Sequence, residues 1–212
     1  MTAEVGLRER KKRQTRQAIF DAAQRLFAER GFDSVTVAEI ARNAEVSEVT
    51  VFNYFPTKED LFYGGMQFFE EQLIEAVRSR ARGESALAAF RRQLLEGADG
   101  LATRERVSAI KKAAQMISKS PGLVARERDI VDLHTRRLAA VLAGESGAAP
   151  DDIEALSVAG ALMVVHRMLV DHIRKRVLGG RRGSELVGDF RTQARKAFRR
   201  LERGLGDFAI KS

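Results

Sequence analysis

The sequence predicts an all-α protein, with a small N-terminal domain followed by a larger helical domain. Three observations support this fold class. Apolar residues recur at helical spacing along most of the chain, only three prolines interrupt it, and the strict alternation typical of β-strands is missing. A chain of 212 residues can hold a small domain beside a larger one. We expect domains at 1–57 and 58–212, with about nine helices in all.

The first expected helix runs from about Arg8 to Arg30, because Ile19, Leu26 and Phe27 share one helical face. Gly31 follows as a natural helix end. The start of this segment is strongly basic, and we treat it as a basic N-terminal arm. Such an arm either contacts DNA phosphates or the minor groove, or is only a solvated tail, and the sequence leaves both open. Its six cations, opposed only by Glu9, are Arg8, Arg10, Lys11, Lys12, Arg13 and Arg16.

Two short helices are expected next, each with a marked start. Thr36 is a suitable N-cap with Glu39 at the reciprocal position of a capping box, and Ser47 offers a second N-cap. The second short helix ends near Tyr54, because Pro56 disfavours helix in the residue before it. Two short capped helices joined by a tight turn and preceded by a longer helix predict a helix-turn-helix.

The second short helix is the expected reading helix for DNA. Val51 and Phe55 lie four residues apart and should face the core together with Val46. Lys58 at the start of the following helix, and Thr36 before the first short helix, are expected to contact phosphates. The outward side chains combine donors, acceptors and a small apolar group, which suit base edges in the major groove: Glu48, Val49, Thr50, Asn53 and Tyr54.

The larger domain is expected to start with a helix capped by Thr57, with Asp60 three residues later, and to continue to about Arg80. Gly64 and Gly65 fall inside this helix, where they serve either as a bend point or to allow close packing against the first helix. The last two helices differ from the rest, because one is apolar nearly all round and the other has a stripe opposite a basic face. This pair predicts a four-helix interface between two protomers. The further expected helices are 84–98, 103–118, 121–144, 151–177 and 184–206.

Composition excludes several classes of function. The chain has no cysteine, so disulfides, thiol catalysis and thiolate metal sites are excluded. His134, His166 and His172 show no ligand motif, the glycine-rich segment 179–183 follows no strand, and no segment suggests a cofactor. We therefore expect neither an enzyme nor a metal protein. The N-terminus lacks the apolar core of a signal peptide and the apolar segment 155–170 is short for a membrane span, which predicts a cytoplasmic protein without membrane contact.

A binding cavity for a small molecule is expected between helices of the larger domain. Its candidate residues are large apolar side chains and histidines that fall on the predicted helices. The alternative is that each of them only fills the core, because Met and Phe at helical spacing usually do so. The candidates are Met66, Phe69, Phe90, Met116, His134, Met163 and His166.

The run from Thr36 to Leu61, TVAEIARNAEVSEVTVFNYFPTKEDL, resembles the signature of the tetracycline-repressor (TetR) family. The resemblance covers roughly residues 10–62, and both caps occur with the ending YFPTKE at the family's spacing. This chain departs from the family at the turn, where Glu45 replaces the usual glycine, so a non-glycine residue is expected there in the left-handed conformation at a cost of about 1 kcal/mol. It also departs at Asn53 and Tyr54, where an aromatic residue and histidine are common. The resemblance implies DNA contacts from Thr36, Ser47, Val49, Thr50, Phe52, Asn53, Tyr54 and Lys58.

The resemblance further implies a homodimer that binds a palindromic operator in double-stranded DNA. A small-molecule effector in the larger domain would then release it. A net charge of +8 agrees with a nucleic-acid partner, although the excess is not concentrated in the helix-turn-helix. The alternative is a DNA-organising helix-turn-helix protein without an effector, which a solid larger domain would favour.

Overall fold

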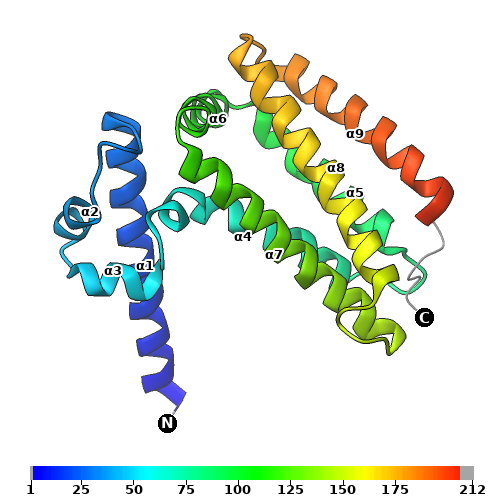
Figure 1. Ribbon diagram of the computed structural model, residues 1–212, viewed down its shortest axis with the longest axis horizontal. Coiled ribbons are helices and arrows are strands. Elements are labelled where there is room, and N and C mark those ends of the chain that lie inside the picture. Colours follow the sequence, from blue (N-terminus) through cyan, green and yellow to red (C-terminus); the bar gives the residue numbers. More distant parts are fainter. Residues whose placement is uncertain (1, 206–212) are drawn as a thin grey trace. The chain divides into compact units, whose positions relative to one another are not determined.

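The computed structural model describes residues 2–205, and side chains from residue 8 to residue 204. The predicted all-α class is confirmed: this described part contains nine α-helices and one 3-10 helix but no strand (Figure 1). The expected end of the last helix at 206 lies outside the described residues. The helices are α1 Thr2–Arg30, α2 Val37–Asn43, α3 Glu48–Tyr54, α4 Lys58–Arg78, α5 Ala86–Glu96, η1 Gly97–Ala102, α6 Arg104–Ile117, α7 Pro121–Ser146, α8 Ile153–Leu178 and α9 Gly183–Leu205.

Two compact units make up the chain. Unit 1 comprises Met1–Met66 together with Met116–Arg126, and unit 2 comprises Gln67–Gln115 together with Glu127–Ser212. Helices α4, α6 and α7 therefore contribute residues to both units. Segments 58–66 and 116–126 are the parts of unit 1 that the expected first domain, 1–57, does not include, because hydrophobic periodicity identifies a helix but not its neighbour.

The core of unit 1 is built around α1 and the start of α4. Phe27, Phe32 and Phe62 form a cluster with ring centroids 5.2 to 6.2 Å apart, and Tyr63 lies 5.0 Å from Phe62. Such tilted and edge-to-face aromatic contacts add to the free energy gained by burying apolar surface. Helix α1 packs against α2 and α2 packs against α3, with Ile19, Ile40 and Val51 completely buried.

The core of unit 2 contains apolar residues of α4, α5, α7, α8 and α9. Helix α8 is buried along one side and, among the described helices, it alone is long and apolar enough to cross a membrane by length and composition. This differs from the expectation that its apolar stretch is too short. A core helix passes the same test, and 39% of its most apolar stretch is buried within the chain.

Helix α9 uses its apolar stripe inside its own protomer. Leu186, Ala194 and Phe198 are fully buried in the core of unit 2. The opposite face is exposed and basic, with Arg195, Arg199 and their neighbours directed to solvent. This part of the α9 stripe therefore packs within one chain, whereas Ala197 and Leu201 of the same stripe are only half-buried.

Candidate functional site

Helices α2 and α3 form the expected helix-turn-helix, and both caps are present. The Thr36 hydroxyl accepts from the Glu39 backbone N–H at 3.2 Å, and the Glu39 carboxylate accepts from the Thr36 backbone N–H at 2.9 Å. The Thr36 backbone N–H and the Arg30 guanidinium lower the pKa of Glu39 to about 2. At α3, the Ser47 hydroxyl accepts from the Thr50 backbone N–H at 3.1 Å. These contacts satisfy backbone groups that the first helical turn would leave free.

The turn between α2 and α3 contains Glu45 in the left-handed backbone conformation, with φ +55°. Among the described residues it is the one non-glycine residue with positive φ. This confirms the expectation drawn from the missing glycine. The turn closes through hydrogen bonds from Glu45 N to Arg42 O at 3.3 Å and from Val46 N to Ala41 O at 3.0 Å. The strain is therefore confined to one residue, at a cost of about 1 kcal/mol.

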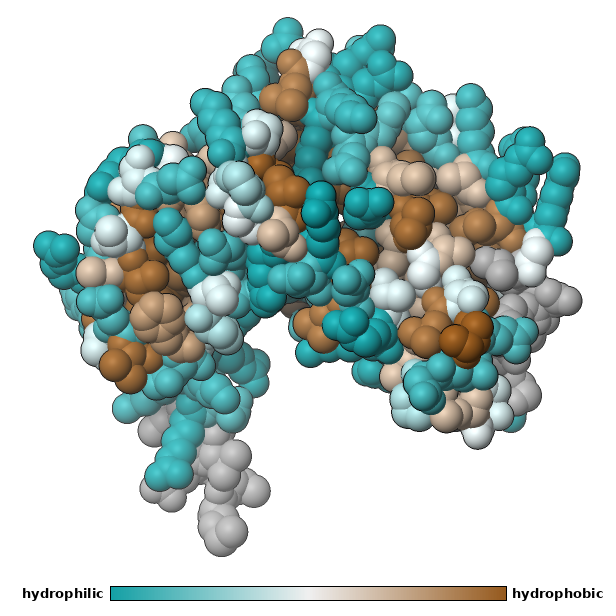
Figure 2. Space-filling view, viewed as in Figure 1, coloured by the Kyte–Doolittle hydropathy of each residue, from teal (hydrophilic) through white to brown (hydrophobic). Residues whose placement is uncertain are grey.

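Helix α3 buries one face and exposes the other. Val51 is completely buried and Phe55 nearly so, as predicted, whereas Val46 is only half-buried. On the opposite face, Val49 is 69% exposed and Phe52 is 47% exposed. Exposed hydrophobic surface is visible on this unit in Figure 2. Of the other predicted contact residues, Thr36, Ser47, Glu48 and Asn53 are exposed, while Thr50 and Tyr54 are half-buried.

Lys58 is half-buried and has contacts within unit 1. Its Nζ donates to the carbonyl oxygens of Phe32 and Val35, both at 3.1 Å, and lies 4.2 Å from the centroid of the Phe32 ring. A lysine ammonium has three donors, so two are occupied by the loop before α2. The expected phosphate contact would use the third donor. Lys58 thus holds the loop that carries Thr36.

The start of α4 is fastened to the start of α7 within unit 1. Thr57 and Asp60 form the expected cap, with the Asp60 N–H donating to the Thr57 hydroxyl at 3.1 Å. Buried Asp60 also accepts from Arg126 at 2.6 and 2.9 Å, and the Tyr63 hydroxyl donates to the Leu123 carbonyl at 2.9 Å. Sequence analysis missed Arg126, because nothing in the local pattern links it to a residue 66 positions earlier.

Gly64 and Gly65 lie in an unbroken α4 and face Phe20 of α1. A Cβ atom at Gly64 would lie 3.0 Å from the Phe20 ring, whereas one at Gly65 would lie 3.5 Å away. Close packing of α4 against α1 therefore accounts for Gly64. A role of the pair as a bend point stays a prediction.

The seven residues expected around a ligand are divided between the two units. Met66 and Met116 belong to unit 1, and the other five belong to unit 2. Phe90 and Met163 are fully buried in the core of unit 2. Phe69, His134 and His166 meet around a residue that sequence analysis missed, Glu70.

Glu70, His134 and His166 form a buried polar cluster, which we call the Glu70 cluster. They are 3%, 1% and 4% exposed. His134 Nδ1 lies 2.8 Å from Glu70 Oε2 and 2.9 Å from the carbonyl oxygen of Ile130. Hydrogen-bond geometry is met toward the Ile130 carbonyl, while the Glu70 carboxylate faces the same nitrogen as an ion-pair partner. His166 Nε2 lies 3.9 Å from Glu70 Oε1, and the ring centroids of Phe69 and His166 are 5.9 Å apart.

Burial acts differently on the two histidines. Desolvation lowers the pKa of His166 to about 4, so this imidazole is neutral at pH 7. Desolvation also disfavours the charged form of His134, but the adjacent Glu70 carboxylate outweighs it and raises the pKa of His134 above its ordinary value. Glu70 could have been found from sequence, because it lies on the apolar stripe of α4, four residues after Met66 and three before Leu73.

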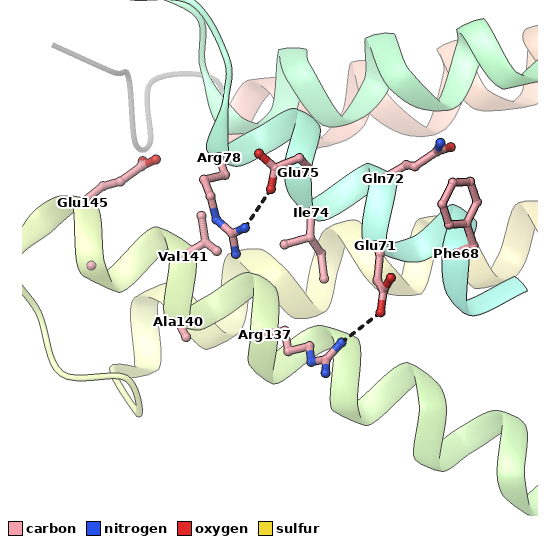
Figure 3. Close-up of a pocket in the computed structure, with 11 residues that line it drawn as sticks. Phe68, Glu71, Gln72, Ile74, Glu75, Arg78, Arg137, Ala140, Val141 and Glu145 are labelled. Carbon is pink, nitrogen blue, oxygen red and sulfur yellow. Dashed lines mark hydrogen bonds and ion pairs between the residues drawn. The ribbon is translucent and has the colours of Figure 1, made fainter. Parts of the chain in front are cut away.

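An open groove of about 860 Å³ lies between α4 and α7 in unit 2 (Figure 3). Its apolar floor includes Ile74 and Val141, and Glu71 contacts Arg137 across it at 3.5 Å. The groove contains none of the seven candidate residues, but it runs along the same two helices as the Glu70 cluster. Glu71 follows Glu70 directly, and Arg137 is about one turn after His134.

The exposed side of α8 is apolar. Ile153 is 75% exposed, Val164 41% and Met168 60%. Spacings of eleven and four residues place all three on one helical face. Gly160 lies on this face as well, and a Cβ atom there would meet open space. Hydrophobic surface follows α8 in Figure 2.

Comparisons with known proteins agree with the helix-turn-helix formed by α2 and α3. Residues 19–63 match the family model described as bacterial regulatory proteins, tetR family. The HTH-type transcriptional regulator TcmR of Streptomyces glaucescens is 32% identical over 159 residues, which cover 69% of this chain and 67% of TcmR. The HTH-type transcriptional regulator LuxR of Vibrio harveyi is 50% identical over 46 residues, but these cover only 22% of either chain.

Solved structures are similar in fold over nearly the whole chain. A TetR transcriptional regulator from Rhodococcus sp. RHA1 has a TM-score of 0.54 at 21% identity, covering 91% of this chain and 98% of that one. Native NalD of Pseudomonas aeruginosa, a repressor of a multidrug efflux pump, has a TM-score of 0.54 at 22% identity, covering 88% and 96%. At these identities the likeness extends to the fold alone.

Proposed function

Because this chain belongs to the TetR family of bacterial regulatory proteins, we propose that it is a homodimeric repressor that a small molecule releases from a palindromic operator. Its DNA-binding part is the helix-turn-helix of unit 1. Repression follows when the dimer occupies a promoter and excludes polymerase. The place of action is the cytoplasm, where the chromosome lies.

The observation that carries this proposal is the exposed face of α3. Val49, Phe52 and Asn53 are exposed on a helix whose other face is buried, and the Ser47 cap fixes its start. An apolar patch beside an amide suits thymine methyl groups and adenine edges in the major groove. Thr36 and Lys58 lie at the starts of α2 and α4, where phosphates are commonly bound.

The exposed apolar face of α8 supports the homodimer. Exposed Ile153, Val164 and Met168 in one row favour burial against another protein surface. An isologous pairing of α8 with α8 would bury this row against itself. The basic exposed face of α9 is less suited to self-association, because like charges would repel. Helix α8 therefore supplies more of the proposed interface than α9.

The Glu70 cluster and the groove beside it support an effector site in unit 2. Effector binding would change the packing of α4 and α7 there, and both helices continue into unit 1. At that end, Asp60 with Arg126 and Tyr63 with Leu123 join the same two helices. An effector that prefers one arrangement of these helices must lower DNA affinity by the same coupling factor.

Footprinting on the DNA that flanks the chain's own gene, with and without candidate metabolites, tests this function. We expect a protected palindrome that an effector abolishes. Protection that no metabolite affects would favour a DNA-organising role without an effector. Weak protection without sequence preference would exclude both functions.

A further inference from the structure

Three buried polar atoms of the Glu70 cluster have no hydrogen-bond partner within the described part of the chain. They are Glu70 Oε2, His134 Nε2 and His166 Nδ1, one each from α4, α7 and α8. Buried polar groups are almost always hydrogen-bonded, because leaving one unsatisfied costs its full desolvation free energy. These three atoms, on three helices, therefore lack the hydrogen bonds that buried polar groups normally make within a fold.

At least two of these atoms accept hydrogen bonds. A carboxylate oxygen accepts hydrogen bonds, and Glu70 Oε2 makes no well-aligned one, although His134 Nδ1 lies 2.8 Å away. His166 is neutral at pH 7, and a proton on Nε2, the nitrogen nearer Glu70, leaves Nδ1 as an acceptor. The other charged groups that act here are Arg137 and Arg174, and Arg174 is already paired with Glu127 at 2.6 Å.

The surroundings of these acceptors are apolar. One helical turn from each cluster member lie Leu73, Leu138 and Met163, all completely or almost completely buried. The Phe69 ring stands beside His166. A molecule bound here would therefore present an apolar body to the core and a hydrogen-bond donor to Glu70.

We infer that the Glu70 cluster is the polar anchor of the effector site and that the effector is an apolar molecule with a donor-rich, cationic head group, namely a protonated amine. This inference rests on the proposed function, because it names the chemistry of the proposed effector. An ammonium supplies three donors and compensates the buried carboxylate. A carboxylate or phosphate head would be repelled by Glu70. The described residues contain no cluster of three or more ligands suited to a metal ion.

Calorimetric titration of the purified full chain with matched head groups tests this inference. The probes are 1-naphthylmethylamine, 1-naphthalenemethanol and 1-naphthoic acid, with dodecylamine as a second amine on a linear body. We expect at least one amine to bind saturably, the alcohol to bind more weakly than the amine, and the acid not to bind.

Two neutral variants separate the anchor from general charge effects. Glu70→Gln should weaken amine binding at least tenfold and leave alcohol binding unchanged, because the amide keeps the shape but loses the charge. Asp132→Asn is the matched control, since this exposed carboxylate on α7 lies two residues before His134 and outside both the cluster and the groove, and it should leave amine affinity unchanged. Circular dichroism verifies that both variants fold, and His166→Gln serves as a second cluster variant if Glu70→Gln does not.

Amine binding that Glu70→Gln leaves unchanged, tighter binding of the acid, or no saturable binding of either amine overturns the inference. Fluorescence anisotropy on the footprinted DNA distinguishes this from failure of the proposed function. An amine that binds through Glu70 without releasing DNA would refute effector-controlled repression but retain the anchor. If an amine releases DNA but Glu70→Gln does not change its binding, the inference about the Glu70 cluster is refuted and the proposed function is retained.

Discussion

Replacing His166 with glutamine should remove part of the acid sensitivity of the fold. Burial lowers the pKa of His166 from 6.5 to about 4, so the folded chain holds this imidazole neutral where the unfolded chain takes up a proton. Protons therefore favour the unfolded state between these two values, and stability falls as pH falls. From pH 7 to pH 5 the loss is about 2 kcal/mol, because one pKa unit corresponds to about 1.4 kcal/mol.

The assay is urea unfolding followed by circular dichroism at pH 7 and pH 5, for the parent chain and His166→Gln. The substitution also removes packing contacts, and it does so at both pH values. The titration of His166 is therefore measured by how much more unfolding free energy the parent loses than the variant between pH 7 and pH 5. We expect the parent to lose about 2 kcal/mol more than the variant between the two pH values. Equal losses would refute the reasoning, and so would a proton NMR titration that gives His166 its ordinary pKa. The opposite shift at His134 acts in the other direction, since its contribution is lost as pH rises through its raised pKa.

Substitutions at four further positions test the DNA contact, the packing of α4 and the dimer interface. Asn53→Ala should weaken specific DNA binding by about 1–3 kcal/mol without changing its salt dependence, since a base contact is lost and phosphate contacts remain; anisotropy titrations at two salt concentrations measure this. Gly65→Ala should raise the free energy of unfolding by up to about 1 kcal/mol in thermal denaturation. Gly64→Ala should be less stable than Gly65→Ala, because its Cβ atom would lie 3.0 Å from the Phe20 ring. If both glycines form a bend point, the double alanine variant should also resist release by effector. Met168→Glu should turn the dimer into a monomer in light scattering after size exclusion; a dimer that survives would place the interface elsewhere.

Local patterns predicted the helix-turn-helix well because its determinants are local. The Thr36 and Ser47 caps, the end of α3 before Pro56 and the strained backbone at Glu45 each depend on a few neighbouring residues. Side-chain chemistry and spacing decide such features directly, so the sequence contains the necessary information.

The candidate effector site was harder to predict because its contacts are between distant segments. Phe69, His134 and His166 were expected near a ligand, but a pattern of apolar and histidine residues does not include Glu70, the charged residue that joins them. Helical periodicity also shows that α9 has an apolar face, but not whether that face packs within the chain or against a partner. Only the packed structure answers that question.

In the proposed dimer, two copies of α3 read DNA together at a separation that the dimer fixes. The most direct test is an anisotropy titration on the footprinted palindrome and on the same duplex with about five base pairs, half a helical turn, inserted at its centre. We predict that the insertion lowers affinity to the non-specific level, typically about a thousandfold or more weaker. Equal affinity for the two duplexes would contradict the claim, because each α3 would then bind its half-site independently.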